Sequence, residues 1–112
     1  MIQFCEALPR NRTTTGIGEQ LTDAAGTAES CCRVACRAGS PEEFIARIAV
    51  AAEEADESKG WLSALLTHEY GDSEEARVLI REAGDLTALF IASQDVARKQ
   101  LRDGRDFRGD CL

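Results

Sequence analysis

Apolar residues recur along most of this chain at the spacing of buried helix faces. From about Thr15 onwards a first stripe alternates steps of four and three residues, the pattern of a helix with one side against a core. Its members are Ile17, Leu21, Ala24, Ala28, Cys31 and Ala35. We expect Gly39 to end this helix, because glycine readily adopts the left-handed conformation found at helix C-termini.

The clearest helix start lies at Ser40, which is a suitable N-cap. Pro41 fits the first helical position, and Glu43 can complete a capping box with Ser40. The predicted helix continues through Gly60 and ends at Gly71. It has a long apolar stripe made of Phe44, Ile48, Ala51, Ala55, Leu62 and Leu65.

Two further helices complete the pattern. Asp72 with Glu75 repeats the capping signal, and the stripe that follows consists of Leu79, Ala83, Leu86, Phe90 and Ala97. Residues Met1 to Leu8 are predicted to form a short helix. We expect it to end before Pro9, because the residue before a proline disfavours the helical conformation. The sequence therefore predicts an all-α, up-down antiparallel four-helix bundle with a short first helix. We expect one domain over residues 1–103 and a frayed C-terminal tail over residues 104–112.

Composition narrows the possible functions. The 112 residues suit a single small domain, and aromatic residues make up only 5% of them, so the helices must approach closely to bury small side chains. The net charge of −7 argues against a general electrostatic grip on nucleic acid. No apolar run has the roughly 18 residues that crossing a bilayer requires, and no signal-peptide pattern is present. We expect a cytoplasmic location.

The cysteines and the single histidine offer little chemistry. Five cysteines are an odd number, which does not resemble a disulfide framework. Cys32 and Cys36 lie one helical turn apart, so a metal pair completed by Cys5 or His68 is conceivable, but buried thiols in a core are the commoner use. One histidine also cannot supply a di-iron site or a recognisable nucleophile and base. We expect no metal, no cofactor and no enzymatic activity.

Charged pairs give the leading binding candidates. Arg33 and Arg37 lie one turn apart and can hold a carboxylate or phosphate together. The interpretation that we favour pairs them with Glu54 and Glu57 of the following helix, within one chain or between two subunits. Trp61 is interpreted as a packing anchor between helices or subunits.

A short first helix leaves part of a four-helix core without its fourth apolar stripe. We therefore expect uncovered apolar surface between the three long helices, and such surface usually marks an interface. Self-association is the predicted consequence. The alternative is a monomer whose alanine-rich helices pack closely enough to need no partner.

Several sequence blocks resemble a known family. The region from Ala7 to about Arg102 is similar to the bacterial four-helix-bundle family also called the 23S rRNA intervening-sequence proteins. The likeness is carried by A-L-P-R from Ala7, G-E-Q-L from Gly18, R-V-A-C-R-A-G-S from Arg33, E-E-F-I-A-R-I from Glu42, and E-E-A-D-E-S from Glu53 with W-L soon after it.

The resemblance implies an up-down four-helix fold that assembles into rings, commonly of five subunits, without an established enzymatic activity. A distant branch of the same fold binds nucleic acid through a basic surface. We therefore expect a non-catalytic homo-oligomeric scaffold or interaction module, with a pentamer as the expected assembly. The alternative is an accessory protein that binds RNA or DNA through a local arginine surface, whose candidates are Arg10, Arg12, Arg33, Arg37 and Arg47.

Overall fold

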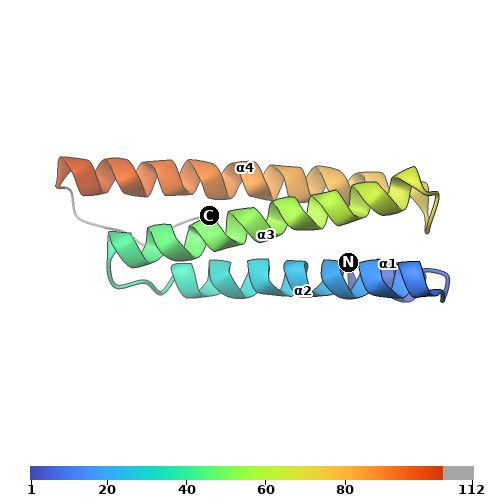
Figure 1. The fold of residues 1–112 in the computed structure, drawn as a ribbon. Helices are drawn as coiled ribbons and strands as arrows, with labels where there is room; N and C mark the ends of the chain where they lie inside the picture. Colours follow the sequence, from blue (N-terminus) through green and yellow to red (C-terminus); the bar gives the residue numbers. More distant parts are fainter. Residues whose placement is uncertain (105–112) are drawn as a thin grey trace.

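The computed structural model describes residues 1–104, which form four helices joined by short turns. They are α1 (Ile2–Glu6), α2 (Arg12–Ala35), α3 (Pro41–Thr67) and α4 (Ser73–Asp103) (Figure 1). These residues contain no strand, so the predicted all-α class is confirmed. Residues 105–112, most of the predicted tail, lie outside the described residues.

The three long helices lie side by side, with α3 between α2 and α4 (Figure 1). Figure 1 shows that each runs opposite to the next one along the chain. Within the described residues, α2 and α4 make little direct contact with each other. The helices therefore form an open layer, and the molecule is elongated, with extents of 52 × 19 × 16 Å.

The predicted caps of α3 and α4 are confirmed. The Ser40 hydroxyl accepts a hydrogen bond from the backbone N–H of Glu43 at 3.2 Å, and the Asp72 carboxylate accepts one from the N–H of Glu75 at 2.8 Å. The Glu43 carboxylate accepts from the N–H of Gly39 at 3.4 Å. It thus reaches one residue beyond the cap, so the reciprocal half of the predicted box is shifted.

The start of α2 lies three residues before the predicted one. Asn11 is its N-cap: the side-chain oxygen accepts from the backbone N–H of Thr14 at 3.0 Å, and the Thr14 hydroxyl accepts from the N–H of Asn11 at 3.2 Å. The buried Thr14 hydroxyl also donates to the carbonyl oxygen of Pro9. This capping box ties α2 to the chain that leads out of α1.

Two helix ends differ from the prediction. The first predicted stop, Gly39, lies beyond the end of α2 at Ala35, and its φ is not positive. The second, Gly71, lies beyond the end of α3 at Thr67 and has a φ of +79° in the following turn. A Cβ atom built on Gly71 would lie 2.9 Å from the Leu8 side chain. This glycine therefore serves the turn and its close contact with the N-terminal segment.

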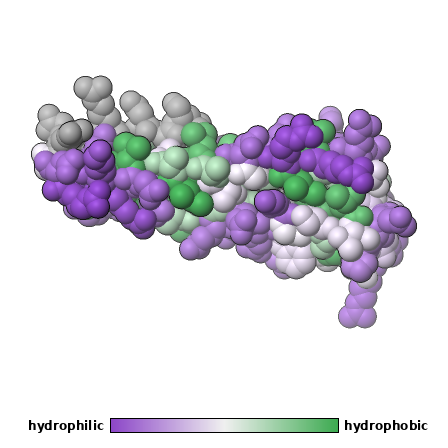
Figure 2. All heavy atoms as spheres, turned by 90° about the horizontal axis from the view of Figure 1, so that it is seen from above, coloured by the Kyte–Doolittle hydropathy of each residue, from purple (hydrophilic) through white to green (hydrophobic). Residues whose placement is uncertain are grey.

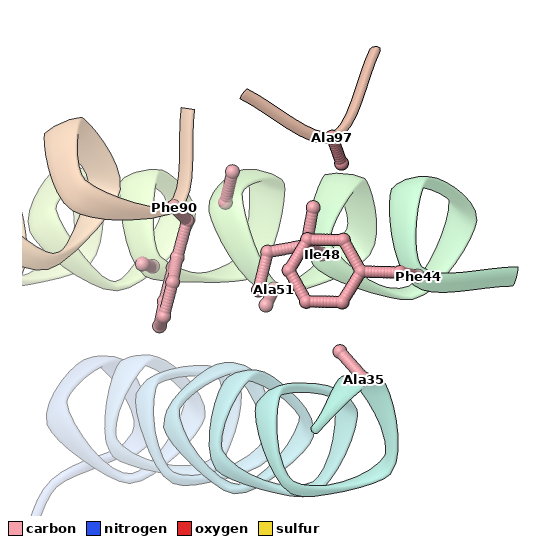
Figure 3. Packing of buried hydrophobic residues seen from close by; sticks show 8 residues of the cluster. Ala35, Phe44, Ile48, Ala51, Phe90 and Ala97 are labelled. Carbon is pink, nitrogen blue, oxygen red and sulfur yellow. The ribbon is translucent and has the colours of Figure 1, made fainter. Parts of the chain in front are cut away.

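Buried side chains gather in two clusters. Near the α2–α3 turn lies the alanine-rich cluster, where side chains from three helices point toward one another (Figure 3). Its main members are Ala35 from α2, Phe44, Ile48 and Ala51 from α3, and Phe90 and Ala97 from α4. At the other end of the layer lies the α1 cluster, which consists of Phe4, Leu8, Leu21, Leu62, Leu65 and Ala76.

Most predicted stripe positions are buried or partly buried, with one exception on α4. Ala83, Phe90 and Ala97 are buried and Leu79 is partly buried, but Leu86 is exposed. The prediction that Leu86 packs in the core of the chain is therefore wrong. A helix that packs against a single neighbour buries only a narrow face, and Leu86 lies beside that face.

Candidate interaction groove

A groove of about 640 Å³ runs between α2 and α4, with α3 as its floor. Met1 lies among its lining residues, so the groove adjoins the start of α1. The α2 side is formed by Ala25, Ala28, Glu29, Cys32, Arg33, Cys36 and Arg37, the floor by Ala55 and Ser58, and the α4 side by Leu79, Glu82, Ala83, Leu86 and Phe90. We refer to this surface as the groove.

The centre of the groove is apolar. Alanines on α2 and α3 face Leu79, Leu86 and Phe90 of α4. The one polar side chain of the floor, Ser58, donates its hydroxyl to the carbonyl oxygen of Glu54 at 2.9 Å within α3, so it demands no outside partner. Covering a surface of this kind with an apolar element is favourable, because it removes apolar side chains from water.

The groove occupies the position of a fourth helix beside three others. At the α1 end this position is filled, because Phe4 and Leu8 pack onto α2, α3 and α4 in the α1 cluster. Beyond Met1, no element within the described residues covers the groove, as the exposure of Leu86 shows. The predicted uncovered apolar surface is therefore present in the structure.

On the α4 side of the groove, Leu79, Ala83 and Phe90 belong to the predicted stripe, whereas Glu82 was not singled out and Leu86 was assigned to the core. A signal for a second face was nevertheless present, because Glu82, Leu86, Leu89 and Ser93 follow a second spacing of three and four beside the buried stripe.

The predicted arginine candidates lie on the α2 rim of the groove. Arg33 donates to the Glu29 carboxylate at 3.2 Å, one turn earlier in the same helix, and both side chains are largely exposed. Arg37 follows one turn later on the same rim. An exposed pair of this type contributes about 0.5 kcal/mol or less to stability.

The predicted pairing of these arginines with Glu54 and Glu57 within one chain is wrong. Among residues 1–104, no ion pair joins the two sets, and neither glutamate lines the groove. The physical reason is that the two sets of side chains face different directions. Arg33 and Arg37 lie on the groove side of α2, whereas the two glutamates project from another side of α3. Sequence spacing alone does not fix this relation between two helices.

Glu54, Glu57 and Trp61 form a local row on α3. The Trp61 indole N–H donates to the Glu57 carboxylate at 3.2 Å, and the ring packs partly buried against the α1 cluster. Partial burial raises the pKa of Glu54, and repulsion from Glu57, a hydrogen bond with that carboxyl group and repulsion from Glu53 raise it further. Trp61 is thus a packing anchor within the chain, and a role between subunits stays a prediction.

The basic candidates for nucleic-acid binding do not form one patch. Arg12 starts α2, whereas Arg33 lies near its end, so the two are separated by about 31 Å at roughly 1.5 Å per residue. Arg10 precedes α2 and Arg37 follows it, which extends the separation. A single phosphate-binding surface would need these side chains together.

The thiols and acidic residues of the described region do not form a metal centre. Among residues 1–104, no group of three or more His, Cys, Asp or Glu side chains is placed to hold an ion. Cys32 and Cys36 share the groove side of α2, as their spacing predicts. The absence of a metal and of catalysis remains an expectation from sequence.

A second hollow, of about 880 Å³, lies between α1 and the first half of α2. Charged side chains of both signs surround it, among them Glu6, Arg10, Glu19 and Asp23. The apolar residues beneath it, such as Leu8, are already buried in the α1 cluster. This hollow has less apolar surface to cover than the groove does.

No helix within the described residues is both long enough and apolar enough to cross a membrane. Comparison of the chain with models of known protein families gave no match, and comparisons with curated proteins and with solved structures gave none either. The groove and its surroundings are therefore the basis for assigning a function.

Proposed function

We propose that this protein is a non-catalytic, homo-oligomeric helical-bundle protein that acts in the cytoplasm as a scaffold or interaction module. In this proposal a second copy covers the groove. The observation that carries it is the uncovered apolar groove between α2 and α4, at the position where a fourth helix would complete a bundle.

The energetic argument rests on the contrast along this fourth position. Where α1 occupies it, Phe4 and Leu8 are almost fully buried. Where nothing occupies it, Leu86 remains 44% exposed, and burying that remaining surface would gain roughly 1 kcal/mol. Surface of this kind on a folded domain is the usual mark of a protein interface.

The sequence blocks that resemble the intervening-sequence family support the same proposal, because that family implies self-assembly without established catalysis. In this reading the chain is an up-down bundle whose fourth position is shared between α1 and a partner. The resemblance also implies rings of five, whereas a two-subunit assembly would require a face that pairs with itself.

Solution mass tests the proposal directly. Size-exclusion chromatography with light scattering, over a wide range of concentrations and with reductant present, should give a mass of at least twice that of the 12.2 kDa chain. A monomer at every concentration would overturn the proposal. A five-subunit mass would support the ring, and a two-subunit mass would support a contact between identical faces.

A further inference from the structure

Helix α4 has two apolar stripes instead of one. The first faces α3 and contains the buried residues Ala76, Ala83, Phe90 and Ala97. The second, mainly apolar stripe runs beside it and consists of Leu79, Glu82, Leu86, Leu89, Ser93 and Val96, of which the first three line the groove. Its steps of three and four residues are the spacing of a seam between two coiled helices.

The second stripe is uncovered over most of its length. Leu86 is 44% exposed, Leu89 40% and Val96 57%. Seen from the side of α4, the surface shows apolar patches between hydrophilic ones (Figure 2). A helix seam left open in this way is suited to burial by a partner helix.

The stripe is complementary to itself when two copies run antiparallel. With Leu86 opposite the partner's Leu89, Leu79 comes to lie opposite the partner's Val96, and Glu82 opposite the partner's Ser93. In this register apolar residues meet apolar ones and the polar residues meet each other. A two-fold axis then passes between Thr87 and Ala88, so each contact occurs twice.

Shifts of one heptad destroy this match. One shift places Glu82 against the partner's Leu86, and the opposite shift places Leu89 against the partner's Ser93. A seam that matches in a single antiparallel register, with itself, is what an isologous two-fold interface requires. An unrelated partner helix would impose no such symmetry on the sequence of α4.

We infer that two copies of this protein pair antiparallel along the second stripe of α4, with Leu86 against the partner's Leu89. This inference rests on the proposed self-association and specifies its surface and symmetry. The contact lies along the α4 side of the groove, since Leu79, Glu82 and Leu86 belong to both surfaces.

Intermolecular nuclear Overhauser effects test the register in the wild-type protein. Leu79 and Val96 lie about 25 Å apart along one helix, at roughly 1.5 Å per residue, so their methyl groups cannot be in contact within one chain. In a mixture of isotope-labelled and unlabelled protein, a filtered experiment should show Leu79–Val96 and Leu86–Leu89 contacts between copies. Association without the Leu79–Val96 contact would overturn the inference and leave the proposed function standing.

A matched pair of variants tests the surface independently. Leu89→Glu should raise the dimer dissociation constant about a hundredfold, because two-fold symmetry buries the new charge twice. Ile91→Glu changes a residue of the same helix with similar exposure, 47% against 40% for Leu89, on the flank away from the second stripe. It should leave the dissociation constant within about threefold of wild type.

Glu82→Leu provides the opposite change. It replaces the charged residue of the seam with an apolar one and should lower the dissociation constant about tenfold. Equal effects of Leu89→Glu and Ile91→Glu, or a weaker dimer with Glu82→Leu, would overturn the inference. A five-subunit ring would overturn the inference and leave the proposed function standing, because a ring uses contacts between unlike faces. A monomer at all concentrations would overturn both.

Discussion

The two ends of the helical layer bury their side chains in different ways. At the α1 end, where a fourth element is present, the core uses large residues such as Phe4, Leu21 and Leu62, all nearly inaccessible to solvent. Near the α2–α3 turn the core is rich in alanine, and Leu86 beside it stays exposed. Large side chains of the central helix, Phe44 and Ile48, are fully buried there too, so the two ends differ in how well the α4 side is covered.

This difference explains why the chain can fold on its own and still leave apolar surface exposed. The α1 end has the packing of a closed domain, in which each truncation leaves a cavity. Along the groove, the small residues let α2 and α3 pack closely without a fourth helix, and Leu86 of α4 is left exposed for an external contact. Folding and association therefore depend on different residues.

The largest expected effect separates these two roles. Leu62→Ala should lower the free energy of unfolding by about 2–5 kcal/mol, because it leaves a cavity at the closed end. Leu86→Ala should lower it by only about 0.5 kcal/mol, since its side chain is already partly solvated. Urea unfolding monitored by circular dichroism, in dilute protein, measures both.

Light scattering on the same two variants completes this comparison. Leu86→Ala should weaken self-association, whereas folded Leu62→Ala should associate as the wild type does. Equal losses of folding stability in the two variants would show that the groove side is as closed as the α1 end.

A smaller effect is expected at the turn that closes the α1 end. Gly71→Ala should lower the free energy of unfolding by about 1–3 kcal/mol, because its φ of +79° disfavours a side chain and its Cβ would lie 2.9 Å from Leu8. The matched control is Gly60→Ala within α3, where no atom lies within 4 Å of the new methyl group. That change should stabilise the protein by about 0.5–1 kcal/mol.

Thermal unfolding of the two glycine variants measures the contrast. A neutral Gly71→Ala variant would mean that the N-terminal segment does not pack tightly on this turn. The closed end would then be no more constrained than the groove.

Local chemistry made the helices predictable from sequence. Ser40 and Asp72 carry cap signals that depend only on neighbouring residues, and both caps form. The stripes of α2 and α3 were also predictable, because burial on one face repeats with the helical period. The start of α2 at Asn11 was missed, although an Asn followed by Thr three positions later is a local capping signal too.

Relations between helices were less predictable. Arg33 and Glu57 each have clear positions in their own helix, but the rotation of one helix about its axis relative to the next decides whether they meet. In the structure they do not. Leu86 was wrongly assigned to the core for a related reason. It lies on a second apolar face of α4, and the sequence period alone does not say how many faces of a helix are covered by other helices of the same chain.

The smallest expected effect lies on α3, where the acidic row joins the two ends. The pKa of Glu54 is raised by burial and by neighbouring glutamates, so the folded state holds this proton more tightly than the unfolded state does. Stability from this group is therefore fully present below the unfolded value near 4.5 and is lost as pH rises through the raised pKa. Glu54→Gln should remove this loss and stabilise the protein above that range by at most about 0.5 kcal/mol.

The gain should disappear at pH values below the ordinary carboxyl range, because Glu54 is then protonated in both states. Urea unfolding followed by Trp61 fluorescence across pH 3–8 measures the difference between the variant and the wild type. Glu19→Gln, which removes one negative charge from an exposed position of α2, is the control and should show no comparable pH-dependent gain. A Glu54→Gln gain that stayed constant with pH would indicate better packing, so the carboxyl group would not be the cause.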